Sequence, residues 1–175
     1  MPDSFAARHP RELSGGQKQR ISIGVALLMD PRLVIADEPV SALDVTVQSQ
    51  ILNLLLKLHA EKQMTILFIS HDLNVVRGLC SRVMVIYKGV IVEEGLAEEI
   101  YEHPAHPYTK LLLEAAIGGD TMELDAEAGK QSAEKCIFYE RCPKRREACA
   151  HVPLSPEAVQ LSRTHWARCI QIGII

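Results

Sequence analysis

The chain has 175 residues, of which 47% are hydrophobic and 23% charged, a balance typical of a globular protein and not of a disordered or fibrous one. Its formal net charge is −3, which argues against a nucleic-acid binder that works through bulk positive charge. No apolar run approaches the roughly 18 to 20 residues that span a bilayer, and the N-terminal segment lacks the apolar stretch of a secretory signal. We therefore expect a soluble, cytosolic protein.

Helical and strand patterns alternate from residue 13 onward. Ser14 is expected to cap a helix through KQRISIGVALLM that ends at Asp30, because a residue before proline avoids helical geometry. The apolar run LVIA at 33–36 predicts a strand buried on both faces. Apolar side chains at positions 47, 51, 54, 55 and 58 then predict an amphipathic helix over residues 45–62.

The next elements continue this alternation. TILFI at 65–69 predicts a second buried strand, and LNVVRGLC predicts a short helix after it. VMVIY and VIVEE, joined by Lys88 and Gly89, predict a hairpin. HPYTKLLLEAA predicts a helix with Pro107 in its first turn. This order of elements predicts an α/β fold with a parallel sheet and flanking helices, in which ligands bind beyond the carboxyl ends of the strands.

The composition changes near the C-terminus. Residues 118–135 are polar, contain glycine and are mostly acidic, which predicts a linker. Residues 136–175 carry four of the five cysteines and are too few to build a sizeable apolar core alone. We therefore divide the chain into a main domain at 1–117, the linker at 118–135 and a cysteine-rich C-terminal extension at 136–175.

The segment LSGGQ at 13–17 has the chemistry of an anion site. Gly15 and Gly16 let a ligand approach the backbone closely, and the N–H groups of a helix start attract anions. The Ser14 hydroxyl would add a donor to a phosphate oxygen. The alternative is a capped helix that follows a glycine turn.

Polar side chains follow both predicted strands. Asp37 and Glu38 come at the end of the first strand, where one carboxylate suits Mg²⁺ and the second would position an attacking water. His71 follows the second strand and would reach the same ligand. The alternatives are a solvated acidic pair in a turn and a histidine that caps a strand or faces solvent.

Four motifs in close succession resemble the ATP-binding subunit of ABC transporters: LSGGQ at 13–17, LVIADEP at 33–39, SALD at 41–44 and FISHD at 68–72. The resemblance implies that the signature motif contacts an ATP phosphate held by a partner subunit, through Ser14, Gly15, Gly16 and Gln17. It also implies that Asp37 is the Mg²⁺-binding Walker B aspartate, Glu38 the catalytic glutamate, Asp44 part of the D-loop and His71 the catalytic switch histidine.

Three segments resemble the oligopeptide/dipeptide importer branch, which includes nickel importers. They are VSALDVTVQSQILNLL, HPAHPYTKLLLEA and the cysteine-rich tail. The branch implies an energy-coupling ATP hydrolase with ATP and Mg²⁺ as cofactors, peripheral on the cytoplasmic face of the inner membrane. Its implied partners are a second homologous ATP-binding subunit, two transmembrane permease subunits and, indirectly, a substrate-binding protein, with no nucleic acid.

One departure from this family concerns the phosphate-binding loop. The 175 residues contain no GxxxxGK[ST], the loop that supplies the backbone cradle and the lysine for the β- and γ-phosphates. We therefore expect the C-terminal half of a P-loop NTPase sheet, truncated before the signature motif, with negligible ATPase activity by itself. The alternative is a non-catalytic fragment that acts as an interaction or iron–sulfur module.

The cysteines are spaced Cys136-x5-Cys142-x6-Cys149-x19-Cys169. In a reducing cytosol such a cluster favours metal binding over disulfides. The spacing is not the paired CxxC of a zinc ribbon, yet four thiolates can hold either Zn²⁺ or an iron–sulfur cluster. The resemblance to the family's C-terminal extension implies a [4Fe-4S] cluster, with Zn²⁺ or unmetallated cysteines as the alternatives. Cys80 is expected to be a small buried apolar residue.

Overall fold

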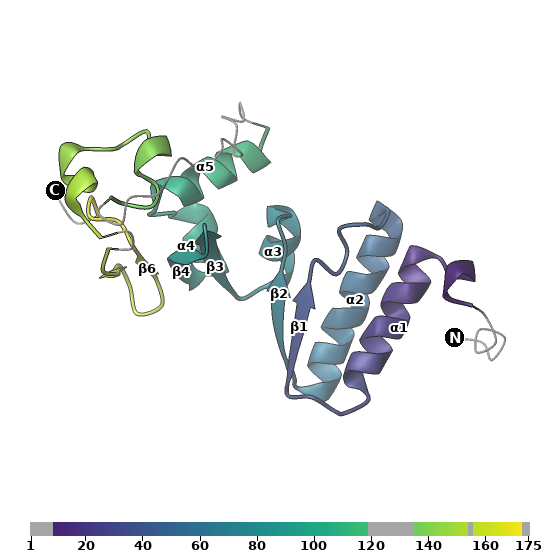
Figure 1. Ribbon diagram of the computed structural model, residues 1–175. Helices are drawn as coiled ribbons and strands as arrows, with labels where there is room; N and C mark the ends of the chain where they lie inside the picture. The colour runs from purple at the N-terminus through teal and green to yellow at the C-terminus, as the bar shows by residue number, and fades with distance from the viewer. Residues whose placement is uncertain (1–8, 119–134, 154–155, 173–175) are drawn as a thin grey trace. The chain divides into compact units, whose positions relative to one another are not determined.

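The computed structural model describes residues 9–118, 135–153 and 156–172, and the chain divides into two compact units, Met1–Leu79 and Cys80–Ile175. In the first unit a short 3-10 helix, Pro10–Glu12, precedes three α-helices and two strands (Figure 1). These are α1 (Gly15–Leu27), β1 (Leu33–Asp37), α2 (Val45–Lys62), β2 (Thr65–Ile69) and α3 (Leu73–Leu79).

The second unit is built on an antiparallel sheet with the strand order β3-β4-β6-β5. Two short 3-10 helices, Tyr139–Arg141 and Glu147–His151, lie in the cysteine-bearing segment. The strands and α-helices of this unit are β3 (Arg82–Tyr87), β4 (Val90–Leu96), α4 (Ala97–Glu102), α5 (Pro107–Ala116), β5 (Val159–Gln160) and β6 (Trp166–Ala167). No helix in the described part of the chain combines the length and hydropathy that a membrane span requires.

Local sequence signals place the ends of the helices. Ser14 caps α1, as its position before the glycines predicts, and the α2 bounds are those that the apolar spacing predicts. Asp44 caps α2 by accepting a hydrogen bond from the backbone N–H of Val47 at 3.0 Å. At the other end of α2, Gln63 takes a left-handed conformation with φ 54°, a common way to stop a helix.

The two parallel strands β1 and β2 have one covered and one open face. Their register pairs Val34 with Ile66 and Ala36 with Phe68 on the face toward the helices. On the other face, Leu33, Ile35, Leu67 and Ile69 are between 42% and 62% exposed. The predictions that β1 is buried on both faces and that β2 is buried are therefore wrong for this chain, because α2 covers only one side of a two-stranded sheet.

The core of the first unit lies between α2 and the sheet. Val40, Ile51 and Leu55 are each at most 4% exposed and form its centre. Half-buried side chains from α1, the loop after β1, α2 and β2 surround them, namely Ile23, Leu43, Val47, Leu52, Ile66 and Phe68. Figure 1 shows α1 and α2 side by side, so α1 packs on α2 as an outer layer.

The predicted hairpin of the second unit is confirmed. Lys88 and Gly89, the two residues of its turn, both have positive φ, 47° and 81°, the geometry that a tight two-residue hairpin requires. β6 then pairs with the free edge of β4, with Glu94 opposite Trp166. The extension thus adds two strands to this sheet, which the sequence did not predict. The parallel arrangement is confirmed for β1 and β2, whereas all pairs among β3 to β6 are antiparallel, two of them as hairpins (β3 with β4, β5 with β6) and one between distant segments (β4 with β6).

The proposed division into main domain, linker and extension stays a prediction. Residues 119–134 of the predicted linker lie outside the described residues. The helix predicted from HPYTKLLLEAA is confirmed as α5, with Pro107 as its first residue. The six-residue α4 was not predicted, because one and a half turns give too little periodicity to recognise.

Candidate functional site

The carboxyl ends of β1 and β2 bring an acidic pair and a histidine together. Asp37 is the last residue of β1, and Glu38 follows with its backbone N–H donating to the carbonyl of Ile69 at 2.9 Å. Two residues beyond Ile69, the His71 Nδ1 atom lies 2.7 Å from Glu38 Oε1. Adjacent parallel strands end at the same edge of a sheet, which explains how residues 33 positions apart meet.

Backbone geometry aims the Glu38 side chain at the strand ends. Glu38 has φ 45°, an uncommon conformation for a residue other than glycine. Ser41 stabilises it, because its hydroxyl donates to the Glu38 carbonyl at 3.2 Å. Non-glycine residues in this region of φ cluster at functional sites, so the conformation makes Glu38 a candidate functional residue.

The Glu38–His71 pair is open to solvent. The side chains of His71 and Glu38 are 78% and 37% exposed. The pKa of His71 is raised above its ordinary value, first by the hydrogen bond to Glu38 and then by the charge of that carboxylate. The histidine therefore holds a proton to a higher pH than a free imidazole, and the pair can exchange a proton with a ligand at the strand ends.

The LSGGQ segment forms the start of α1 with a reciprocal cap. The Ser14 backbone N–H donates to Gln17 Oε1 at 2.9 Å, and the Gln17 N–H donates to Ser14 Oγ at 3.4 Å. A Cβ atom on Gly16 would lie 2.4 Å from a methyl carbon of Val47, and one on Gly15 would lie 3.0 Å from Leu43. Both glycines thus allow α1 to approach the loop and first turn of α2. The phosphate-binding role of these residues stays a prediction, and so does the D-loop role of Asp44.

The four cysteines of the extension line one cavity in the second unit. Its wall contains Cys136, Cys142, Cys149 and Cys169 together with His106, Pro107, Phe138, Tyr139, Val152, Pro156, Ile170 and Gln171. Cys149 is buried, and its carbonyl accepts a hydrogen bond from the Cys136 N–H at 3.1 Å. Burial raises the pKa of the Cys136, Cys142 and Cys169 thiols. Cys80 is only half-buried and does not line this cavity.

The sulfur positions bear on the predicted metal. Within the described ranges 9–118, 135–153 and 156–172, no three His, Cys, Asp or Glu side chains form a group that could hold a metal ion. This finding supports neither Zn²⁺ nor an iron–sulfur cluster at these four cysteines, so the predicted metal stays a prediction.

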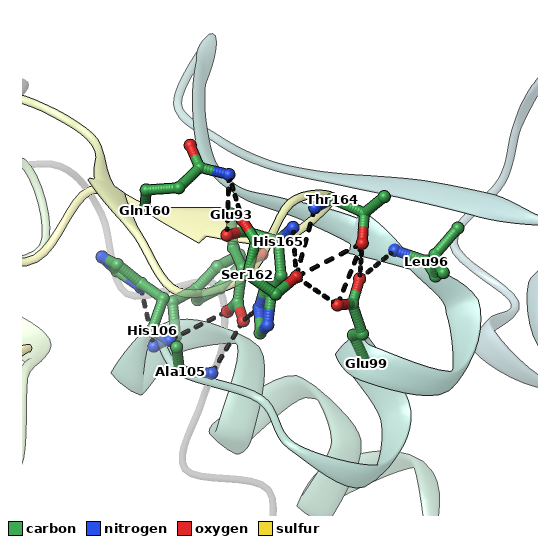
Figure 2. Close-up of polar contacts among 10 residues, drawn as sticks. Glu93, Leu96, Glu99, Ala105, His106, Gln160, Ser162, Thr164 and His165 are labelled. Carbon is green, nitrogen blue, oxygen red and sulfur yellow. Dashed lines mark hydrogen bonds and ion pairs between the residues drawn. The ribbon is translucent and has the colours of Figure 1, made fainter.

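A buried carboxylate joins three segments of the second unit (Figure 2). Glu93 of β4 is fully buried and accepts hydrogen bonds from Ala105 N–H at 2.7 Å and His106 N–H at 2.8 Å. His165, from the hairpin of β5 and β6, places its Nε2 atom 2.7 Å from the same carboxylate. Three donors compensate the burial of the charge. Glu93 was not predicted as a site residue, although two adjacent glutamates of a strand point to opposite faces, so one of them faces the covered side.

A second carboxylate ties the same hairpin to α4. Glu99 accepts hydrogen bonds from the Ser162 and Thr164 hydroxyls and from the Leu96 backbone N–H. These bonds, led by the one from Ser162, lower the pKa of the Glu99 carboxyl. Figure 2 shows Glu93 and Glu99 on the two sides of the His165 segment, so the extension is held to β4 and α4 by polar contacts.

Two families of known proteins match separate parts of this chain. Residues 1–41, which carry LSGGQ and the acidic pair, match the ABC transporter family, and residues 92–149 match the family of oligopeptide/dipeptide transporter C-terminal regions. The oligopeptide transport ATP-binding protein AppF of Bacillus subtilis is 42% identical over 95% of this chain. The chain belongs to the ATP-binding proteins of oligopeptide/dipeptide ABC transporters. The oligopeptide transport ATP-binding protein OppF of Streptococcus pyogenes is 59% identical over 62% of the chain.

The matches cover only part of the length of each relative. The aligned region is 53% of AppF and 35% of OppF, so the chain spans about half the length of the first of these relatives. A solved dimeric structure of the ATP-binding cassette MJ0796, described as a post-hydrolysis state bound to ADP and Pi, is 36% identical. The match covers 55% of this chain and 41% of the MJ0796 chain, with a TM-score of 0.49. Asp44, His71 and Cys169 lie outside the two family matches.

Proposed function

We propose that the first unit of this chain forms the signature, Walker B and switch part of the energy-coupling ATP-binding subunit of a peptide-type ABC importer. The observation that carries this proposal is the 2.7 Å contact between Glu38 and His71 at the carboxyl ends of two parallel strands. There Asp37 would bind Mg²⁺, Glu38 would orient and polarise the attacking water, and His71 would assist hydrolysis. Bound ATP and Mg²⁺ would supply the phosphoryl group and the charge that neutralises it.

The signature segment has a different role in this proposal. Ser14, Gly15, Gly16 and Gln17 begin α1, where backbone N–H groups point out of the helix end. They would cap the γ-phosphate of ATP held by a second, homologous ATP-binding subunit, with Asp44 in the D-loop nearby. Two permease subunits would receive the resulting movement at the cytoplasmic face of the membrane, and a substrate-binding protein would select the peptide. Neither family match distinguishes an oligopeptide from a dipeptide, so the transported substrate is not assigned.

ATP turnover with a complementary half tests the catalytic assignment. A polypeptide of these 175 residues lacks GxxxxGK[ST], so we expect negligible turnover from it alone. Mixed with an N-terminal half that supplies the phosphate loop and Q-loop, it should hydrolyse ATP. Glu38→Gln and His71→Ala should each lower kcat by about 10²-fold or more, as loss of a general base or its partner does.

A matched control keeps the test specific. Glu61 is an exposed glutamate of α2 that pairs with Lys57 on the helix surface, so Glu61→Gln should leave turnover unchanged. Equal rates for the Glu38→Gln and Glu61→Gln mixtures would overturn the catalytic assignment. No association of the two halves would favour the alternative, a non-catalytic interaction or iron–sulfur module.

We also propose that Cys136, Cys142, Cys149 and Cys169 hold a [4Fe-4S] cluster. The proposal is supported by the single cavity that all four line and by the basic residues between them. Anaerobic reconstitution with Fe²⁺ and sulfide should give four iron atoms per chain and the broad visible absorption of a cluster. Cys149→Ser should abolish this absorption, whereas Cys80→Ser should retain it. Stoichiometric zinc without iron would overturn the assignment.

A further inference from the structure

Asp72, the residue after His71, is tied to the chain through both its backbone and its side chain. Its backbone N–H donates to Ser70 Oγ at 3.1 Å, across the histidine. Its Oδ1 atom accepts hydrogen bonds from the backbone N–H groups of Asn74 at 3.0 Å and Val75 at 3.2 Å. The segment that carries His71 is thus fixed by hydrogen bonds at the residue before it and at the residue after it.

The start of α3 depends on this aspartate. α3 has seven residues, and isolated helices of this length are unstable in water. The Asp72 carboxylate satisfies two of the N–H groups that a helix start leaves without an intrahelical partner. Val76 is the buried residue of α3, and its N–H donates to the Asp72 carbonyl at 3.1 Å. α3 therefore begins at a fixed point directly after His71, and burial of Val76 holds that point to the first unit.

The contact between His71 and Glu38 relies on this backbone. Glu38 is held at the end of β2, because its N–H donates to the Ile69 carbonyl at 2.9 Å. The His71 side chain is 78% exposed, so packing contributes little to the direction of its ring. Its place 2.7 Å from Glu38 is therefore set by the backbone on which it stands, between Ser70 and Asp72.

We propose that Asp72 is a positioning residue for ATP hydrolysis, whose carboxylate caps α3 and thereby holds the His71 ring against Glu38. The proposal rests on the proposed function of that pair. Displacement of a catalytic group by about 1 Å can lower a rate by about 10²-fold, so a cap that fixes the histidine bears on turnover. Asp72 acts through the cap and not through its charge. Asparagine, which caps a helix about as well, should therefore replace it.

Turnover in the mixture with the complementary N-terminal half tests the proposal. Asp72→Ala removes the cap and should lower kcat about tenfold. Asp72→Asn keeps the cap without the charge and should stay within about twofold of the unchanged chain. Ile23→Val is the stability control, because Ile23 packs against the core of the first unit and loss of one methyl group costs about as much stability as loss of a cap. This control should leave kcat unchanged.

A second comparison shows whether Asp72 acts through His71. In a His71→Ala chain, the further change Asp72→Ala should leave kcat as it is, because no ring remains to be positioned. A loss by the same factor in both backgrounds would mean that Asp72 only supports the fold, and would overturn the proposal. Equal losses in Asp72→Ala and Asp72→Asn would also overturn it, because they would assign the effect to the charge.

A titration of the His71 ring by NMR on the 175-residue chain needs neither ATP nor the second half. The pKa of His71 is raised chiefly by its hydrogen bond to Glu38 and, to a smaller extent, by the charge of Asp72. Asp72→Ala and Asp72→Asn both remove that charge, so a lower pKa in the alanine variant reports loss of the hydrogen bond. Equal pKa values would overturn the positioning. If Asp72→Ala does not fold, Ser70→Ala removes the other hydrogen bond and is compared with Ser70→Thr, which keeps the hydroxyl.

The outcomes separate the two proposals. Unchanged turnover in Glu38→Gln and His71→Ala would overturn the proposed function, and the pKa comparison would then decide the role of Asp72; it also decides if the two halves do not associate. Low turnover in those variants, with Asp72→Ala equal to the unchanged chain in kcat and to Asp72→Asn in the His71 pKa, supports the proposed function and overturns the role of Asp72. Low turnover in all three, with rescue by Asp72→Asn, supports both.

Discussion

Substitution of Glu93 by glutamine should destabilise the second unit strongly while changing almost none of its volume. Glu93 accepts three hydrogen bonds, from Ala105, His106 and His165. A glutamine has one acceptor oxygen, so its NH₂ group must face at least one N–H donor. This leaves at least one buried donor unpaired and removes the carboxylate that the His165 ring contacts. The expected loss is about 3 to 5 kcal/mol, against about 5 to 15 kcal/mol for a whole domain.

The chain carries its own probe for this experiment. Trp166, the single tryptophan, lies in β6 opposite Glu94, so its fluorescence reports the docking of the extension on β4. For an m-value of about 1.5 kcal/mol/M, Glu93→Gln should lower the urea midpoint by about 2 to 3 M. Glu94→Gln is the matched control: its partner Arg82 is half-exposed, so the loss should be about 1 kcal/mol. Equal midpoints for the two variants would refute the reasoning.

Three further predictions concern packing and protonation. Gly16→Ala should destabilise the first unit by about 1 to 3 kcal/mol, because the added Cβ clashes with α2. Gly24→Ala has open space around the added Cβ and should stabilise this unit by up to about 1 kcal/mol. Thermal unfolding compares the two variants, and equal effects on stability would contradict the packing of Gly16 against α2. The His71 pKa, followed by NMR, should fall toward its ordinary value in Glu38→Gln. Because that pKa is raised in the folded chain, the pair's contribution to stability is present at low pH and lost as pH rises through it. Burial lowers the pKa of His106 to about 4, so the free energy of unfolding of the metal-free chain should decrease as the pH falls from 6.5 toward 4. The decrease should be smaller in His106→Gln, because glutamine does not titrate in this range.

Local signals in the sequence predicted every α-helix except α4, and also the first hairpin. Caps, prolines and a period of 3.6 residues depend on near neighbours, so α1, α2 and α5 appear where their residues indicate. The meeting of Glu38 and His71 was also predictable, because parallel strands end at a common edge. The four cysteines were expected at one site from their clustering near the C-terminus and from the family resemblance, and all four line one cavity.

Features that depend on distant neighbours were not predictable. An apolar run such as LVIA does not show whether one or two layers cover the strand, which explains the error for β1 and β2. β5 and β6 have two residues each, too few for any alternation to be recognised. Glu93 looks like a surface residue until His165, 72 positions later, supplies a donor. His106 similarly acquires its place beside the cysteines only through the packing of α5.

The bond between Glu93 and His165 also limits how this part of the chain can be divided. The family of C-terminal regions matches residues 92–149, yet His165 and both strands of the second hairpin come after residue 149. A polypeptide cut at those limits would contain the buried carboxylate without one of its three donors, and β4 without its β6 neighbour. It would also lack Cys169. The matched family region therefore ends before contacts that hold this unit together, and a shortened polypeptide of this region should keep the residues through Cys169.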